Sequence, residues 1–288
     1  MKSFVPHTLS TKKLHGLLLG AVGPRPIAFA STIDQDGNPN LSPYSFFNVF
    51  SSNPPVMIFS PSRRVRNNTT KHTLENAEAT GEVVVNIVNY AIVQQMSLSS
   101  TEYGDGVNEF EKSGLTMQAS DEVQPFRVKE SPVQFECKVI KINALGDQGG
   151  AGNLIFAEVV KIHVKDDIIS DDLMINQHKI DQVARMGGSW YSRAKEGMFE
   201  VPKPLSSLGI GVDALPDDIK NSTILTGNDL GKLGNLDKFP DAHQQSEYAK
   251  KNPHLKGLKS VDLHKLAKKY LDENEPNEAA LILTQNNI

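Results

Sequence analysis

A stretch of fourteen residues, 60–73, concentrates side chains that bind oxyanions. A phosphate monoester is held by clustered N–H and O–H donors with cations nearby. Thr73 is also placed to cap a helix, and the positive end of a helix dipole favours an anion. The donors and cations are Ser60, Ser62, Arg63, Arg64, Arg66, Thr69, Thr70, Lys71 and Thr73. A phosphate-binding loop and a solvated basic loop both fit this composition.

Two further segments offer groups for a planar ligand. Residues 42–48 contain short polar side chains, and Pro43 keeps the backbone extended, so that N–H groups can stay free for a ligand. The aromatic residues Phe46, Phe47 and Phe50 would equally suit a core or an interface. Residues 186–193 (MGGSWYSR) pair two glycines, which permit close backbone approach, with aromatic rings. A turn with aromatic packing fits that segment equally well.

Short strands joined by turns must position these groups. Buried or β-branched runs predict strands at 27–33, 56–60 and 82–89, with a hairpin turn at 34–38. A second, long hairpin is predicted for 133–145 and 153–164. Helices are expected at 74–79, ending at Gly81, and at 176–185, with Gly187 as C-cap. Since no regular strand–helix alternation occurs, we expect a mainly β fold with peripheral helices, arranged as a closed or nearly closed antiparallel barrel.

The chain divides into two parts by composition. Residues 1–200 contain the strand-rich region, whereas residues 201–288 contain a helical pattern in which Leu263, Leu266, Ala267 and Tyr270 share one face. We expect residues 201–288 to be an extension with helical and irregular structure. It would pack on the barrel or on a second subunit.

Several function classes are disfavoured. The net charge of −4 is unlike that of proteins that track phosphate backbones, so a nucleic acid is not expected as partner. No apolar run approaches the roughly 18 residues of a membrane span. There is no G-x-G-x-x-G motif or Walker P-loop, and the scattered histidines and single cysteine indicate no metal site. One cysteine, Cys137, also fits the reducing cytoplasm.

Seven short segments fall in an order that is specific as a series. They are residues 23–28 (GPRPIA), 31–32 (ST), 36–37 (DG), 40–48 (NLSPYSFFN), 54–60 (PPVMIFS), 71–76 (KHTLEN) and 84–88 (VVNIV). The series resembles the flavin reductase-like family of FMN-binding split barrels, over roughly residues 10–200. The resemblance implies a split β-barrel, FMN near a homodimer interface, and NADH or NADPH as the reductant of a flavin or a related small substrate.

Under this resemblance the loop at 60–73 would bind the FMN phosphate, and residues 42–48 would face the pyrimidine edge of the isoalloxazine ring. Arg25 would stabilise negative charge near N1 and the C2 carbonyl, or would pair with a carboxylate instead. The expected cofactor-binding residues are Arg25, Ser42, Tyr44, Ser45, Phe46, Asn48, Ser60, Arg63, Lys71, Thr73, Gly188 and Tyr191. No catalytic side chain is expected, because the cofactor supplies the chemistry. An FMN-holding electron carrier and a flavin-binding protein without turnover remain the alternatives.

Overall fold

The computed structural model describes residues 1–104, 106–201 and 208–287. The chain forms two compact units, Met1–Phe199 and Glu200–Ile288, each with its own hydrophobic core. No helix among the described residues is long and apolar enough to cross a membrane.

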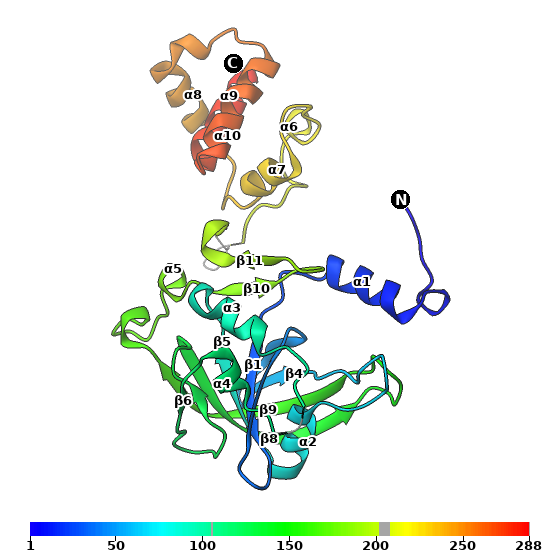
Figure 1. Cartoon of the computed structure of the whole chain (residues 1–288). Helices are drawn as coiled ribbons and strands as arrows, with labels where there is room; N and C mark the ends of the chain where they lie inside the picture. The colour runs from blue at the N-terminus through cyan, green and yellow to red at the C-terminus, as the bar shows by residue number, and fades with distance from the viewer. Residues whose placement is uncertain (105, 202–207, 288) are drawn as a thin grey trace. The chain divides into compact units, whose positions relative to one another are not determined.

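A seven-stranded antiparallel sheet forms the centre of the first unit (Figure 1). Its strand order is β2-β1-β5-β8-β9-β4-β3, which places β2 and β3 at the ends. The strands are β1 (Ala28–Ile33), β2 (Pro39–Tyr44), β3 (Phe47–Ser52), β4 (Pro55–Phe59), β5 (Glu82–Ile87), β8 (Val133–Ala144) and β9 (Asn153–Val164). The mainly β, split-barrel fold expected from the sequence is confirmed.

Strand β1 is buried along its whole length because both faces of the sheet are covered there. Ala28 and Ala30 contribute to one core, which contains Phe59 and helix α2 (His72–Thr80). Phe29 contributes to a second core beside α3 (Val93–Leu98) and α4 (Glu109–Ser113). The predominantly apolar sequence of β1, in which Ser31 and Thr32 are the polar residues, follows from this double coverage.

Both predicted hairpins are confirmed. Asp34 accepts hydrogen bonds from the backbone N–H groups of Asp36 and Asn38, which fixes the turn between β1 and β2. Strands β8 and β9 pair from Val133↔Val164 to Ala144↔Asn153. Cys137 lies within β8, fully buried opposite Val83 and Val159, and burial raises the pKa of its thiol.

Thr73 is not the N-cap of α2. The cap position belongs to Lys71, while Thr73 lies inside the first turn and is 1% exposed. Its Oγ1 accepts hydrogen bonds from Asn40 Nδ2 (2.8 Å) and from the Tyr44 hydroxyl (2.9 Å) of β2. This tertiary polar cluster explains why the residue is buried rather than at the cap. Gly81 ends the helix in a left-handed conformation, as predicted.

The predicted helix at 176–185 is also wrong beyond its first turn. Asn176 does cap α5 (Gln177–Ile180), but Asp181 then adopts a left-handed conformation with φ of 51°. Both carboxylate oxygens of Asp181 accept hydrogen bonds from Arg193, at 2.8 and 2.7 Å. Strand β10 (Val183–Arg185) therefore pairs with β11 (Tyr191–Arg193), and Gly187 lies in the connecting turn instead of at a helix C-cap.

The remaining elements of the first unit are short. Helix α1 (Thr11–Ala21) buries none of its residues and lies beside the β10–β11 hairpin in Figure 1. The others are η1 (Pro6–Thr8), η2 (Tyr90–Ile92), β6 (Met117–Gln118), β7 (Arg127–Val128), η3 (Asp166–Ile168) and η4 (Ala194–Glu196).

The described part of the second unit is helical. Its elements are α6 (Asp217–Lys220), α7 (Gly227–Gly234), α8 (Ala242–Lys251), η5 (Pro253–Leu255), α9 (Ser260–Asp272), α10 (Pro276–Leu283) and η6 (Thr284–Asn287). Leu263 and Ala267 of α9 are fully buried, and Leu266 and Tyr270 pack against the same core, as the helical pattern predicts. Capping boxes at Thr226 and Asp241 define where α7 and α8 begin.

Candidate functional site

Residues 60–73, which we continue to call the 60–73 loop, comprise the connection from β4 and the first two residues of α2, and the arginines of this segment shape it. Arg63 donates to the side-chain and backbone oxygens of Asn68, at 2.8 and 2.7 Å. Arg64 donates to Thr69 Oγ1 (3.0 Å) and to the carbonyl of Thr70. These hydrogen bonds hold the loop in a defined conformation and fix the positions of Arg63 and Arg64, so the loop is ordered by its own side chains.

Three cations of this region converge on one carboxylate. Glu102, in the loop after α3, lies 3.4 Å from Arg64 Nε, 3.1 Å from Arg66 Nη2 and 3.7 Å from Lys71 Nζ. Burial, together with the charge of Arg64, lowers the pKa of Lys71. We call Arg64, Arg66 and Lys71 the cation cluster. It offers a concentration of positive charge suited to an oxyanion.

Ser60 provides a polar group without a partner at the start of the same loop. It is 6% exposed, and its Oγ is buried with no hydrogen-bond partner among the described residues. A buried hydroxyl in this state requires an explanation, and a bound ligand is one. With the cation cluster nearby in sequence, these donors suit a ligand that carries a phosphate.

A cavity of about 150 Å³ brings the other two predicted segments together. Tyr44 and Ser45 line it from the end of β2, and Tyr191 lines it from β11. The remaining lining residues are Ile27, Pro43, Met96, Ser100 and Arg185. Burial raises the pKa of Tyr44, although its hydrogen bonds with Ser42 and Thr73 oppose the shift, so this phenol stays protonated and donates to Thr73. The buried Tyr44–Thr73 bond connects the cavity wall to the 60–73 loop.

Arg25 is buried and binds backbone oxygens rather than a carboxylate. It donates to the carbonyls of Leu19 (2.8 Å), Val22 and Met186 (3.0 Å), and its Nε lies 3.4 Å from Ser45 Oγ. It thus satisfies carbonyls at the C-terminal end of α1 and connects that end to the β10–β11 turn. Burial and nearby Arg185 lower the pKa of Arg25. Its predicted contact with a flavin stays a prediction.

Other predicted residues lie outside the cavity wall. The Phe46 side chain is exposed, with its ring 6.3 Å from that of His15 in α1. Asn48 is exposed on β3, and its Oδ1 accepts the N–H of Val49. Gly188 has a φ of 58° and open space around it, whereas a Cβ on Gly187 would lie 3.0 Å from the Gly20 Cα. Gly187 therefore permits close packing on α1.

Sequence reasoning missed four residues of the region: Met96, Ser100, Glu102 and Arg185. Arg185 lines the cavity, stacks 4.5 Å from the centroid of the Tyr191 ring and donates to the carbonyl of Gly188 at 2.6 Å. This role was not predicted, because Arg185 lies at the end of the segment that we expected to be helical. Met96, Ser100 and Glu102 follow one another on α3 and its loop, where no motif distinguishes them from a surface segment.

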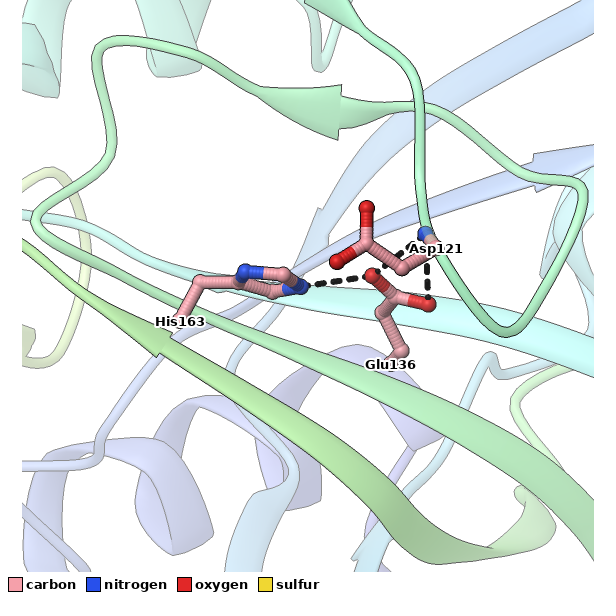
Figure 2. Close-up of side chains that lie close together, drawn as sticks. All are labelled: Asp121, Glu136 and His163. Atoms are coloured by element: carbon pink, nitrogen blue, oxygen red, sulfur yellow. Dashed lines mark hydrogen bonds and ion pairs between the residues drawn. The ribbon is translucent and has the colours of Figure 1, made fainter.

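A second polar cluster, distant in sequence, contains Asp121, Glu136 and His163 (Figure 2). Their possible ligand atoms lie within 4.8 Å of one another, as in a metal site. Each group is already engaged. Glu136 is fully buried and contacts His163 Nε2 at 2.6 Å. It also accepts hydrogen bonds from the backbone N–H groups of residues 121, 122 and 123. The carboxylate of Asp121 pairs with Lys161 at 2.7 Å. The arrangement anchors the loop at 119–126 to β8.

Comparisons with known proteins agree with the fold. A family model described as "Flavin reductase like domain" matches residues 21–184, more than half of the chain. An uncharacterized protein of Aquifex aeolicus is 41% identical over 191 residues, which are 66% of this chain and 95% of that protein.

Several solved structures are similar to this chain, and two of them show the likeness. Nitrilotriacetate monooxygenase component B from Bacillus cereus is 28% identical, with a TM-score of 0.66, over 70% of this chain and 98% of that protein. A putative flavin reductase with a split barrel domain from Shewanella frigidimarina is also 28% identical, with a TM-score of 0.59, over 69% of this chain and 96% of that protein.

Proposed function

Because the chain belongs to the flavin reductase-like family, we propose that it is an oxidoreductase that binds FMN and uses NADH or NADPH as reductant. The observation that carries the proposal is the 60–73 loop. There, the orphan hydroxyl of Ser60 and the cation cluster lie on one short connection between β4 and α2. FMN fits because its phosphate matches the cations and its ring offers groups for buried hydroxyl donors.

The chain's own residues would bind and orient the cofactor. Arg64 and Lys71 would hold the phosphate, and Arg63 keeps the loop in shape through Asn68. Tyr44, Ser45 and Tyr191 would confine a planar group, since they line one cavity. A bound FMN would supply the redox chemistry by accepting a hydride at N5. No proton transfer from a side chain is required, and the polypeptide contributes position, electrostatics and exclusion of water.

The purified protein is expected to bind FMN more tightly than riboflavin or FAD. Riboflavin lacks the phosphate, and the loop offers no evident site for the adenylate half of FAD. Titration calorimetry with the three flavins measures this preference. Equal affinities would remove the phosphate basis of the proposal.

Steady-state oxidation of NADH and NADPH, with and without added FMN, tests the catalytic part. Oxidation by the FMN-loaded protein is expected, with one nicotinamide preferred. If oxidation occurs only when a protein acceptor is present, the protein is an electron carrier instead. If FMN binds and neither nicotinamide is oxidised under any condition, the chain is a flavin-binding protein without this activity.

We also propose a homodimer. Strand β3 is an end strand with Val49 and Phe50 exposed, and α1 exposes Leu17 and Leu18. Such apolar surface beside an unpaired strand edge favours association. Light scattering is expected to give twice the chain mass of 31.6 kDa, and Phe50→Glu is expected to shift the protein toward monomer. A 31.6 kDa particle across a wide concentration range would contradict the proposal.

The compartment that we propose for this protein is the reducing cytoplasm.

A further inference from the structure

We infer that Glu102 is a built-in counter-ion of the cation cluster that competes with the phosphate of the cofactor. The inference rests on the proposed function, because it takes the cluster to be the phosphate site. Glu102 then becomes a residue that sets the affinity for phosphate-bearing flavins and weakens it.

The carboxylate of Glu102 contacts the cation cluster in the way that a bound oxyanion would. One carboxylate oxygen of Glu102 lies near both Arg64 and Lys71, and the other lies near Arg66. A carboxylate and a phosphate are both bound by arginine and lysine through their oxygens, so the two groups would seek the same donors. The Glu102 side chain is 46% exposed, which leaves it room to move into solvent.

The charges explain why a counter-ion is present. Arg64 and Lys71 repel each other, and burial of Lys71 adds a desolvation penalty to its charged form. Glu102 offsets both effects in the flavin-free protein. A phosphate dianion would do the same more strongly, but if Glu102 stayed in place it would repel that dianion at short range.

The position of Glu102 in the chain connects the cluster to the cavity. Met96 and Ser100 line the cavity, and Glu102 follows Ser100 by two residues. The wall itself is held independently of Glu102, because Ser100 and Thr101 donate backbone hydrogen bonds to Ser97 and Leu98, and Met96 is buried in the core. Replacing Glu102 is therefore expected to change the charge at the cation cluster and to leave the cavity wall in place.

The test compares FMN and riboflavin affinities, by titration calorimetry, for the full chain and for Glu102→Gln. The variant keeps the size of the side chain and removes its charge. FMN is expected to bind about tenfold more tightly to Glu102→Gln, because one repulsive charge near the phosphate is lost. Riboflavin affinity is expected to stay unchanged, because riboflavin has no phosphate.

Glu78→Gln is the matched control. It removes the same charge from an exposed position on α2, outside the cation cluster, and is expected to leave both affinities within about twofold, as for a screened surface charge. Melting temperatures of both variants establish that they are folded.

Two failures can be told apart. If the unmodified chain prefers FMN to riboflavin and Glu102→Gln binds FMN no better, the inference is wrong while the phosphate site stands. The inference is also wrong if Glu102→Gln binds both flavins more tightly by the same factor. If the unmodified chain binds FMN and riboflavin equally, the cation cluster is not a phosphate site, and both the phosphate assignment and the inference fall.

Discussion

Replacing Glu136 with alanine is expected to lower the free energy of unfolding by about 3 to 5 kcal/mol, as for removal of one partner from a buried charged network. Glu136 is fully buried and accepts three backbone N–H groups of the loop at 119–126. Without it, those donors would lose their acceptor inside the protein, and the guanidinium of Arg127, 3.8 Å away, would lose a nearby opposite charge. Chemical denaturation followed by circular dichroism measures the loss.

Glu122→Ala is the control for this prediction. Glu122 lies in the same loop, but its side chain is 55% exposed and its ion pair with Lys161 is long, at 3.8 Å. Its replacement is expected to change stability by no more than about 0.5 kcal/mol. Equal losses for both variants would show that Glu136 has no special anchoring role.

Glu136 is also expected to make the stability of the fold depend on pH. Burial opposes ionisation of Glu136, but hydrogen bonds from the backbone of Asp121 and Glu122 and from His163 outweigh it and hold its pKa below the ordinary value of 4.5. A carboxyl with a lowered pKa contributes stability above that ordinary value and loses the contribution as pH falls through the folded-state pKa. Below about pH 4.5 the unmodified chain is therefore expected to lose stability more steeply than Glu136→Gln.

Lys71→Ala is expected to weaken FMN binding by about 1.5 to 3 kcal/mol, the value of a lost charged hydrogen bond. Arg63→Ala is expected to weaken it as well, through a different cause, because Arg63 shapes the loop through Asn68. The two causes separate in thermal melting of the flavin-free protein. Arg63→Ala should lower the melting temperature, and Lys71→Ala should leave it nearly unchanged.

Lys138→Ala serves as the control, since Lys138 also pairs with a carboxylate, Glu82, between two strands of the first unit. FMN affinity is expected to be unaffected by it. Unchanged FMN affinity in Lys71→Ala and Arg63→Ala together would mean that the 60–73 loop is only a solvated basic surface.

The fold was largely predictable because its signals are local. The turn at Asp34–Asn38 contains the residues that its own hydrogen bonds need, and the β8–β9 hairpin is indicated by alternation in residues 138–142 and by the glycine-rich turn that follows. The errors occurred where distant contacts override local preference. Asp181 ends α5 because Arg193 of strand β11 binds its side chain. Thr73 does not cap α2 because its hydroxyl accepts hydrogen bonds from Asn40 and Tyr44.

The site was predictable in composition and less so in geometry. Sequence reasoning found the cations of the loop at 60–73, and it found Tyr44, Ser45 and Tyr191, which the cavity brings together. It could not find Glu102, because a single glutamate more than thirty residues from Lys71 carries no spacing signal. The buried acceptor Glu136 was missed for the same reason, since its partners come from a loop and a neighbouring strand.

The burial of Cys137 has a consequence for how oxidants can act on this protein. A thiol reacts as its thiolate, and here the thiolate is suppressed by a raised pKa and shielded on both sides by β5 and β9. Since Cys137 is the single cysteine in the sequence, the folded chain has no sulfhydryl that could be sulfenylated, glutathionylated or cross-linked as a regulatory signal. Alkylation of this residue would instead report the opening of the central sheet, because the reagent can reach it only when β8 separates from its neighbours.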